Sequence, residues 1–123
     1  MSFHDWDEVP AEEVTELYHR KIACLEHLMI ARIEVLKGAV TESHTHESEE
    51  VVMVLKGAWR FYLPTGEVTV RENQLLSIPP GVEHSSEVLE DCVALDICTR
   101  RPDWLSGEDR FRHRHPDELL WAV

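Results

Sequence analysis

Side chains of the kinds that bind transition metals gather between Gly38 and Gly57. His44 and His46 are separated by one residue, and Glu50 follows shortly after them. On a β-strand, residues i and i+2 point to the same face, so two imidazoles at this spacing can reach one ion. Glu50 has the same parity, and its longer side chain can approach from the next stretch of backbone. The residue types and their spacing therefore predict a metal site.

A fourth candidate ligand, His84, follows the rigid turn of Pro79, Pro80 and Gly81. Three neutral imidazoles and one carboxylate suit Mn, Fe, Co, Ni, Cu or Zn rather than Ca or Mg. We expect one divalent transition metal, with Zn, Ni, Mn and Fe as the candidates. Four protein ligands leave a coordination position open at five- or six-coordination, and a catalytic or ligand-binding metal needs such a position.

A second H-x-H pair, His113 and His115, stands near the end of the chain. Its surroundings offer neither a third ligand nor the alternating pattern of a strand. We interpret this pair as part of a solvated segment.

Asp96 is the best candidate for an acid or base beside the metal. It lies in the otherwise apolar stretch 92–99, CVALDICT. An acid in such a strand costs free energy unless it is paired or functional. The alternative is that Asp96 points to solvent from an edge strand. We favour the functional interpretation, in which Asp96 is catalytic.

Three aromatic residues and one arginine follow Gly57 at positions 59–62, and the side chains of one parity must line the interior. The glycine can break the strand register, so the sequence leaves open whether Trp59 and Phe61 or Arg60 and Tyr62 face inward. Aromatic residues in such a run belong more often to a core than to a substrate platform.

Two adjacent arginines, Arg100 and Arg101, follow the strand of Asp96. They could hold a substrate carboxylate. Adjacent arginines more often form a solvated rim, which is the interpretation that we favour.

The elements that position these residues are short and apolar. At least seven strands separated by turn signals are predicted, which favours an all-β antiparallel sandwich or barrel. The N-terminal stretch is ambiguous, because 11–17 can open a helix while 20–25 reads equally well as a strand. A short helix is plausible at 116–123. The predicted strands are 29–36, 51–55 (covered on both faces), 59–63, 68–70, 75–78, 85–89 and 92–99.

The composition bounds the possible partners. The chain has 123 residues, 43% of them hydrophobic, and a formal net charge of −12. This acidity argues against nucleic acid and anionic membrane surfaces but does not exclude a small anionic substrate. With no apolar membrane segment and no signal pattern, we expect a cytoplasmic protein that acts on a small molecule. We interpret the three cysteines, Cys24, Cys92 and Cys98, as reduced and mostly buried thiols.

The stretch from Gly38 to Gly57 resembles the first cupin motif, G-x5-H-x-H-x3-E-x6-G, without a mismatch. The second motif, G-x5-P-x-G-x2-H-x3-N, is met at its prolyl turn and at His84, whereas Asn73 replaces its first glycine and Val88 its final asparagine. The resemblance implies a single cupin domain over 1–123, with its barrel core at about 29–99. The flanks would be an N-terminal arm or edge strand at 1–28 and a C-terminal extension at 100–123. It also implies a double-stranded β-helix or jelly roll, an interior metal held by three histidines and one glutamate, and often a homodimer.

A narrower resemblance is to the small cupins that open unsaturated uronate rings during pectin and alginate breakdown. It is carried by the segments 27–57 and 92–105. In that family an aspartate at the place of Asp96 is implicated in proton transfer, and an arginine follows it. Arg100 or Arg101 matches that arginine with a small offset, while Cys98 replaces an aromatic residue and Glu50 a frequent glutamine.

Three functions are compatible with the predicted site. The first is a metal-dependent enzyme of isomerase, lyase or ring-opening type that acts on a sugar acid or keto acid. The second is a metal-dependent dioxygenase, and the third is a non-catalytic ligand-binding protein. The ligand types alone do not separate them.

Overall fold

The computed structural model describes residues 1–106 and 113–114, and strands dominate it. The all-β architecture predicted from the sequence is confirmed. One short α-helix and one 3₁₀ helix accompany the strands in the described residues. In chain order the elements are η1 (Trp6–Glu8), β1 (Glu12–Thr15), β2 (Tyr18–Cys24), β3 (Leu28–Val35), β4 (Val40–His44), β5 (Glu50–Leu63), β6 (Gly66–Arg71), β7 (Leu75–Ile78), β8 (His84–Thr99), α1 (Pro102–Ser106) and β9 (His113–Arg114).

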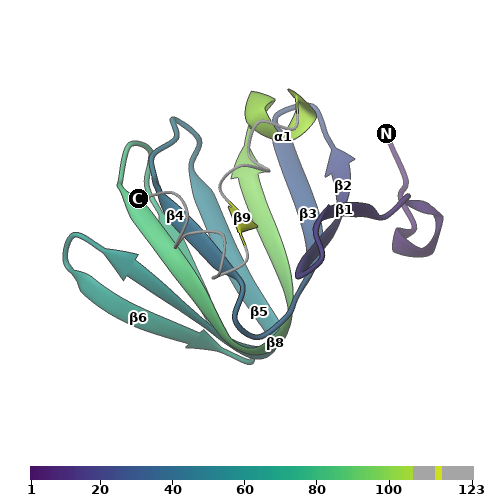
Figure 1. The fold of residues 1–123 in the computed structure, drawn as a ribbon. Coiled ribbons are helices and arrows are strands. Elements are labelled where there is room, and N and C mark those ends of the chain that lie inside the picture. The colour runs from purple at the N-terminus through teal and green to yellow at the C-terminus, as the bar shows by residue number, and fades with distance from the viewer. Residues whose placement is uncertain (107–112, 115–123) are drawn as a thin grey trace.

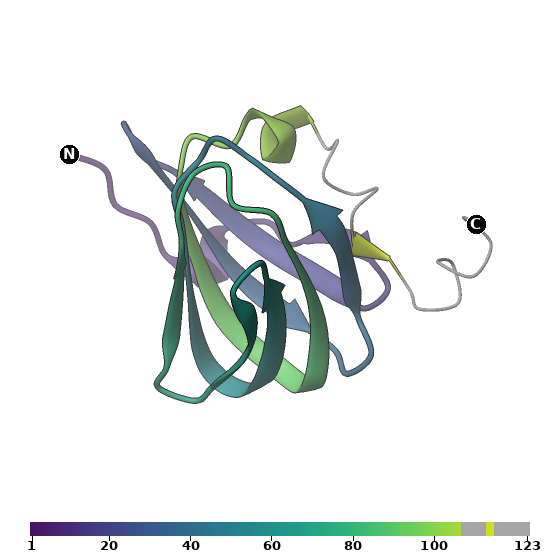
Figure 2. The same cartoon turned by 90° about the vertical axis from the view of Figure 1, so that its left-hand side faces the viewer.

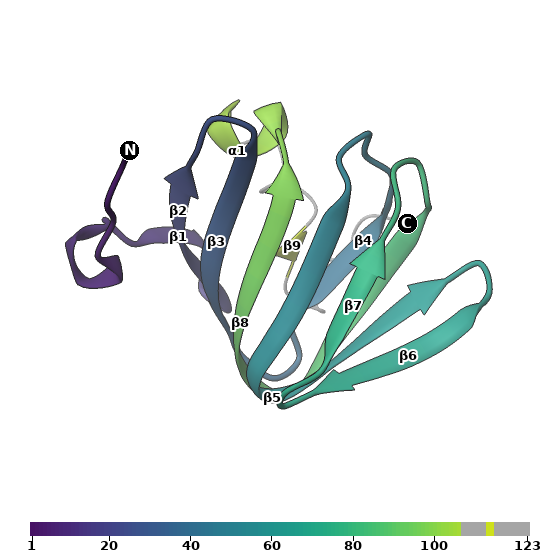
Figure 3. The ribbon, with the colours of Figure 1, turned by 180° about the vertical axis from the view of Figure 1, so that it is seen from behind.

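Two long strands, β5 and β8, organise the sheet. They pair antiparallel from Glu50 opposite Cys98 to Tyr62 opposite Ser85. The second half of β8 also pairs with β3, and its first half pairs with β4. Strand β7 pairs with the first half of β5 and β6 with the second half. The two long strands therefore run through two leaves of one antiparallel sheet, which diverge from the bend of β5 and β8 (Figures 1 and 3).

The interior of the two leaves follows directly from the alternation of side chains. On β8, even-numbered residues from His84 to Cys98 are buried, except Glu90 at the bend. On β3, the four apolar residues of the predicted inner face are all buried. They are Met29, Ala31, Ile33 and Val35.

On β5 the buried face changes parity at the bend. Val52 and Val54 are buried before it, and Trp59 and Phe61 after it. Between them the register with β8 shifts, and Gly57 has a positive φ of 98°. The sequence left open which side chains after Gly57 face inward. The change of parity turns Trp59 and Phe61 inward.

Several predicted boundaries were wrong at these bends. Gly57 was expected to end a strand, and the chain was expected to turn at Glu90 and Asp91, but β5 and β8 continue through both places. The stretch 51–55 is also not covered on both faces, since Leu55 is 44% exposed. A glycine or an acid pair can mark a bulge within a strand as well as its end.

The two ends of the chain differ from the predictions as well. The helix considered for 11–17 is wrong, because this stretch holds β1 and the turn into β2. His113 is not in an irregular segment either, because β9 pairs with β4. The helix predicted at 116–123 lies outside the described residues. Within the described part, no helix is long and apolar enough to cross a membrane.

The upper end of the leaves carries α1, which follows β8 closely (Figure 2). Its Trp104 is buried in the core together with residues of both leaves. Strand β2 brings Tyr18 and Arg20 to the same interior, and both are almost completely buried. The N-terminal arm and the start of the C-terminal extension therefore help to enclose the space between the leaves.

Candidate metal centre

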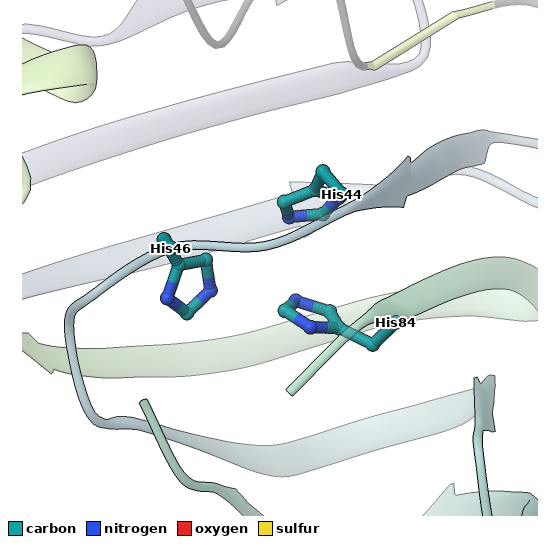
Figure 4. Close-up of side chains that lie close together, drawn as sticks. All are labelled: His44, His46 and His84. Carbon is teal, nitrogen blue, oxygen red and sulfur yellow. The ribbon is translucent and has the colours of Figure 1, made fainter. Parts of the chain in front are cut away.

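Three histidines from three parts of the chain converge between the leaves. His44 is the last residue of β4 and His84 the first of β8, and the two are direct cross-strand partners. His46 lies just beyond β4, in the loop that leads to β5. Figure 4 shows their imidazole rings turned toward a common space. The expectation that both residues of the H-x-H pair lie on a strand therefore holds for His44 alone.

The orientation of each ring exposes the same nitrogen to that space. A backbone carbonyl accepts a hydrogen bond from Nδ1 of each histidine, which places the ring proton on Nδ1 and makes Nε2 the nitrogen of the neutral imidazole that can bind a metal. Metal-binding histidines are held by such outer hydrogen bonds. The carbonyls are those of Glu42 for His44 (2.7 Å), Ser48 for His46 (2.9 Å) and Val82 for His84 (2.8 Å).

The donor set fits a divalent transition metal. One nitrogen of each histidine lies within 4.8 Å of the others. The Nε2 atom of His46 is buried and has no hydrogen-bond partner, as expected of an atom whose partner is an ion. Burial lowers the pKa of His84, which favours the neutral ring that a metal requires. The three histidines would therefore hold the ion.

Glu50 lies beside the triad and divides its two oxygens between different neighbours. Its Oε1 is 3.6 Å from Nε2 of both His46 and His84, and its Oε2 is 3.5 Å from Nη1 of Arg101. Two ligands of one ion lie roughly 3.0–3.4 Å apart when the metal–ligand bonds are roughly 2.1 Å, so Oε1 is slightly farther from the two nitrogens than a bound oxygen would be. Its role as a fourth ligand stays a prediction.

Glu50 also forms a buried carboxyl pair with Asp96. Burial raises the pKa of Asp96 well above its ordinary value, and the neighbouring Glu50 carboxylate raises it further. For Glu50, burial acts in the same direction, but the neighbouring His46 ring, the Asp96 carboxyl group and the charge of Arg101 outweigh it and lower the pKa to about 2. The proton of the pair therefore resides on Asp96, while Glu50 is a carboxylate.

Asp96 is buried, and the alternative of a solvent-facing residue on an edge strand is wrong. Its strand lies between β3 and β5, where Asp96 pairs with Ala31 and Val52. Only 6% of the residue is exposed, and its Oδ1 has no hydrogen-bond partner. An acid with an unused buried oxygen is available for chemistry with a bound molecule.

Arg101 belongs to the interior, contrary to the predicted solvated rim, whereas Arg100 is exposed. Arg101 is 3% exposed, and its guanidinium donates two hydrogen bonds to Asp103, from Nε (2.9 Å) and from Nη2 (2.7 Å). Its Cζ lies 5.1 Å from the centre of the Trp104 ring. The Asp and Trp that follow Arg101 closely in sequence were the available signal, since they can hold a guanidinium in place.

The N-terminal arm contributes a second buried arginine that the sequence interpretation missed. Arg20 pairs with Glu12 across the β1–β2 hairpin, with 3.1 Å between Nε and Oε2. It lies 6.0 Å from the ring of Tyr18 and 5.5 Å from that of Trp104. Tyr18 and Arg20 are two residues apart, so they lie on the same face of β2. Recognition of β2 as a strand would therefore have been enough to predict that they face the interior together.

Several of these residues line one cavity of about 380 Å³, part of which is open to solvent. Histidines, acids, an arginine and aromatic rings meet there, which is the mixed lining of small-molecule sites. The lining comprises Tyr18, Thr41, His44, Glu50, Val52, Trp59, Phe61, His84, Ser86, Asp96, Arg101 and Trp104.

Comparison with known proteins places this arrangement in a family. The family model described as "Cupin domain" matches residues 31–98, which are more than half of the chain. Acireductone dioxygenase 1 of Pectobacterium atrosepticum is 29% identical over 90 residues, which are 66% of this chain and 52% of that protein. The chain therefore spans about half the length of that curated relative.

Solved structures agree with the family match. KdgF from Halomonas sp. is 28% identical with a TM-score of 0.76, and the match covers 84% of this chain and 99% of KdgF. An RmlC-like cupin from Shewanella frigidimarina is 20% identical with a TM-score of 0.77, over 85% and 96% of the two chains. The polyketide cyclase RemF from Streptomyces resistomycificus is 22% identical with a TM-score of 0.71, over 83% and 82%. The last two show the shared fold alone. On the family match and this fold, the chain belongs to the cupin family.

Proposed function

We propose that this cupin is a metal-dependent enzyme that acts on a small polar metabolite, such as a sugar acid or keto acid, by an isomerase, lyase or ring-opening reaction. One observation carries the proposal. Asp96 is a buried acid whose Oδ1 is unpartnered, and it lines the same cavity as His44 and His84. A candidate proton-transfer group and two histidines of the triad therefore line one space, where a bound molecule would meet both.

The chemistry follows from the state of these residues. A divalent metal on the three histidines would polarise a carbonyl or hydroxyl oxygen of the substrate. Asp96, protonated beside the Glu50 carboxylate, can give a proton to the substrate and take one back at a second position. Arg101 keeps its positive charge, because Asp103 and Glu50 outweigh the effect of burial and raise its pKa above the usual range. The resemblance of the Asp96 segment to uronate ring-opening cupins supports a sugar acid as the substrate.

A second candidate is a metal-dependent dioxygenase. It is favoured by the relative named acireductone dioxygenase 1, although the shared region covers 52% of that protein. The same triad would serve either reaction, but a buried acid such as Asp96 is better suited to a reaction that transfers protons, which favours the first candidate.

The first experiment tests the metal site. Elemental analysis of the purified protein should find close to one transition-metal ion per chain, and His46→Ala and His84→Ala should each lose most of it. Near-stoichiometric metal in both variants would refute the site. Glu47→Ala is a suitable control, because Glu47 lies in the same loop as His46 but is exposed.

The second experiment tests Asp96. Asp96→Asn should keep its metal and lower kcat on a responsive sugar acid or keto acid by about 10²-fold or more, as expected for loss of an acid–base group. Full activity of Asp96→Asn would overturn its role. Turnover that requires oxygen and iron would favour the dioxygenase. Ligand binding without turnover by any metal form would favour a binding protein.

A further inference from the structure

Trp59 carries a buried hydrogen-bond donor with no acceptor. The residue is 4% exposed, and its indole Nε1 has no hydrogen-bond partner. Indole nitrogen is a donor only, and buried indoles usually find an acceptor. Leaving such a donor unpaired costs free energy, so each case calls for an explanation.

The position of Trp59 supplies one. Trp59 lines the same cavity as His44, His84 and Asp96. It lies on β5 beyond the bend and pairs with Val88 and Val70, whereas Asp96 pairs with β3 and with the part of β5 before the bend. The unpartnered Nε1 of Trp59 and the unpartnered Oδ1 of Asp96 therefore belong to opposite leaves of one cavity.

The neighbours of Trp59 are suited to hold its ring still. Its centre lies 5.1 Å from that of Phe61, and both rings are buried. A rigid aromatic ring places its single donor at a defined point and loses little conformational entropy when a ligand arrives. Ser86, opposite Phe61 on β8, adds a small polar side chain to the same wall.

We propose that the Nε1–H group of Trp59 determines substrate specificity by donating a hydrogen bond to an oxygen of the substrate, from the leaf opposite that of Asp96. The ligand class is a small metabolite with a hydroxyl, carbonyl or carboxylate oxygen on the side that faces Trp59. The inference rests on the proposed function for the existence of a substrate, but not on the reaction type. An analogue without that oxygen leaves the donor unpaired and binds more weakly.

Trp59→Phe tests the proposal, because it keeps an aromatic ring beside Phe61 and removes the N–H group. The variant should retain its metal and most of kcat, while KM for a responsive substrate rises about tenfold, the usual worth of one such hydrogen bond. Trp6→Phe is the matched control, since Trp6 lies in η1 and outside the cavity lining, and it should leave both constants unchanged. An unchanged KM in Trp59→Phe overturns the proposal.

A spectroscopic readout separates this inference from the proposed function. In ¹⁵N-labelled, zinc-loaded protein, the indole signal that disappears in Trp59→Phe identifies Trp59. We expect it at the position of an indole without a hydrogen bond, and we expect it to move downfield on titration with D-galacturonate, D-glucuronate or pyruvate. A signal already at a hydrogen-bonded position in the free protein overturns the proposal. So does binding that shifts histidine signals but not this one, and binding by none of the three probes overturns the ligand class.

Discussion

Each imidazole of the triad takes its orientation from its own neighbourhood in the sequence. The carbonyl that accepts from Nδ1 belongs in every case to a residue two positions away along the chain. The rings are therefore aimed by local backbone geometry, and the pairing of β4 with β8 only has to bring them together. Such a site loses little freedom when a metal binds.

The three cysteines differ in their exposure to solvent. Cys24 is exposed, while Cys92 and Cys98 are buried, and all three are free thiols. Burial raises the pKa of Cys92 to about 11 and raises that of Cys98 as well. Because the thiolate is the reactive form, a pKa near 11 leaves only about 0.1% of Cys92 reactive at pH 8.

We therefore predict one thiol that reacts rapidly with Ellman's reagent in the native protein at pH 8, and three after denaturation. Cys24→Ser should abolish the rapid reaction. Rapid reaction of a second thiol in native Cys24→Ser would contradict the burial of Cys92 and Cys98. The earlier interpretation of mostly buried thiols agrees with these positions, with Cys24 as the exception.

At this scale the sequence identified the residues that stand near each other in the chain. His44, His46 and Glu50 fall within one short motif, and His84 is recognisable from its prolyl turn. Arg101 was misplaced because adjacent arginines look like surface residues, and its contact with Glu50 spans 51 positions of the chain. Asp103 and Trp104 were the local signal that pointed the other way.

At the scale of elements, the bend of β5 decides which side chains reach the cavity. A Cβ atom at Gly57 would lie 2.2 Å from the carbonyl oxygen of Asp91, closer than any packed contact. The glycine lets the two long strands cross closely at the bend, and the bulge there exchanges the inner and outer faces of β5.

Gly57→Ala should therefore lower the free energy of unfolding by more than the strain of a left-handed alanine alone. Gly38→Ala is the matched control, because Gly38 has a similar φ of 92° but no neighbour within 4 Å of the added atom. We expect Gly38→Ala to lower the free energy of unfolding by about 1–2 kcal/mol, because alanine is strained in the left-handed conformation. Gly57→Ala should lose clearly more in urea unfolding, because the backbone of β8 must move.

Equal losses in the two variants would show that the close approach of Asp91 does not matter. The comparison also explains why the sequence divided β5 and β8 into four strands. Gly57 and the Glu90–Asp91 pair are ordinary signals of a turn, and only the pairing partner shows that the ladder continues through them. The turn implied between the predicted strands 59–63 and 68–70 carries its signal locally, and the structure has a hairpin there, in which Leu63 pairs with Gly66.

At the scale of the whole molecule, one leaf is apolar on its outer face as well. Register places Ile30 and Val51 beside Ile97, and Leu75 and Leu95 beside Met53. Leu75 is 60% exposed, and the other five are partly buried by one another. We propose that this face pairs with a second copy of the chain, because a large apolar patch on a sheet face is otherwise a liability in water.

Light scattering at micromolar concentration should then give a dimer. Met53→Glu should shift it toward the monomer, because a charge in the centre of the buried face is left unpaired. Leu105→Glu is the control, since Leu105 is 64% exposed on α1, away from this face, and it should leave the dimer intact. A wild-type monomer under these conditions would rule the pairing out.

The alternation of inward and outward side chains along β8 also limits where residues can be inserted into this chain or deleted from it. His84 and Asp96 point inward from the same strand, and every second residue between them does too, except at the bend. Adding or deleting one residue between them would turn one of the two to the outer surface, because alternation along a strand has a period of two. Insertions in the hairpin loop between β5 and β6 carry no such penalty. Evolution of new specificity in this scaffold is therefore freer to lengthen loops than to alter the spacing from His84 to Asp96.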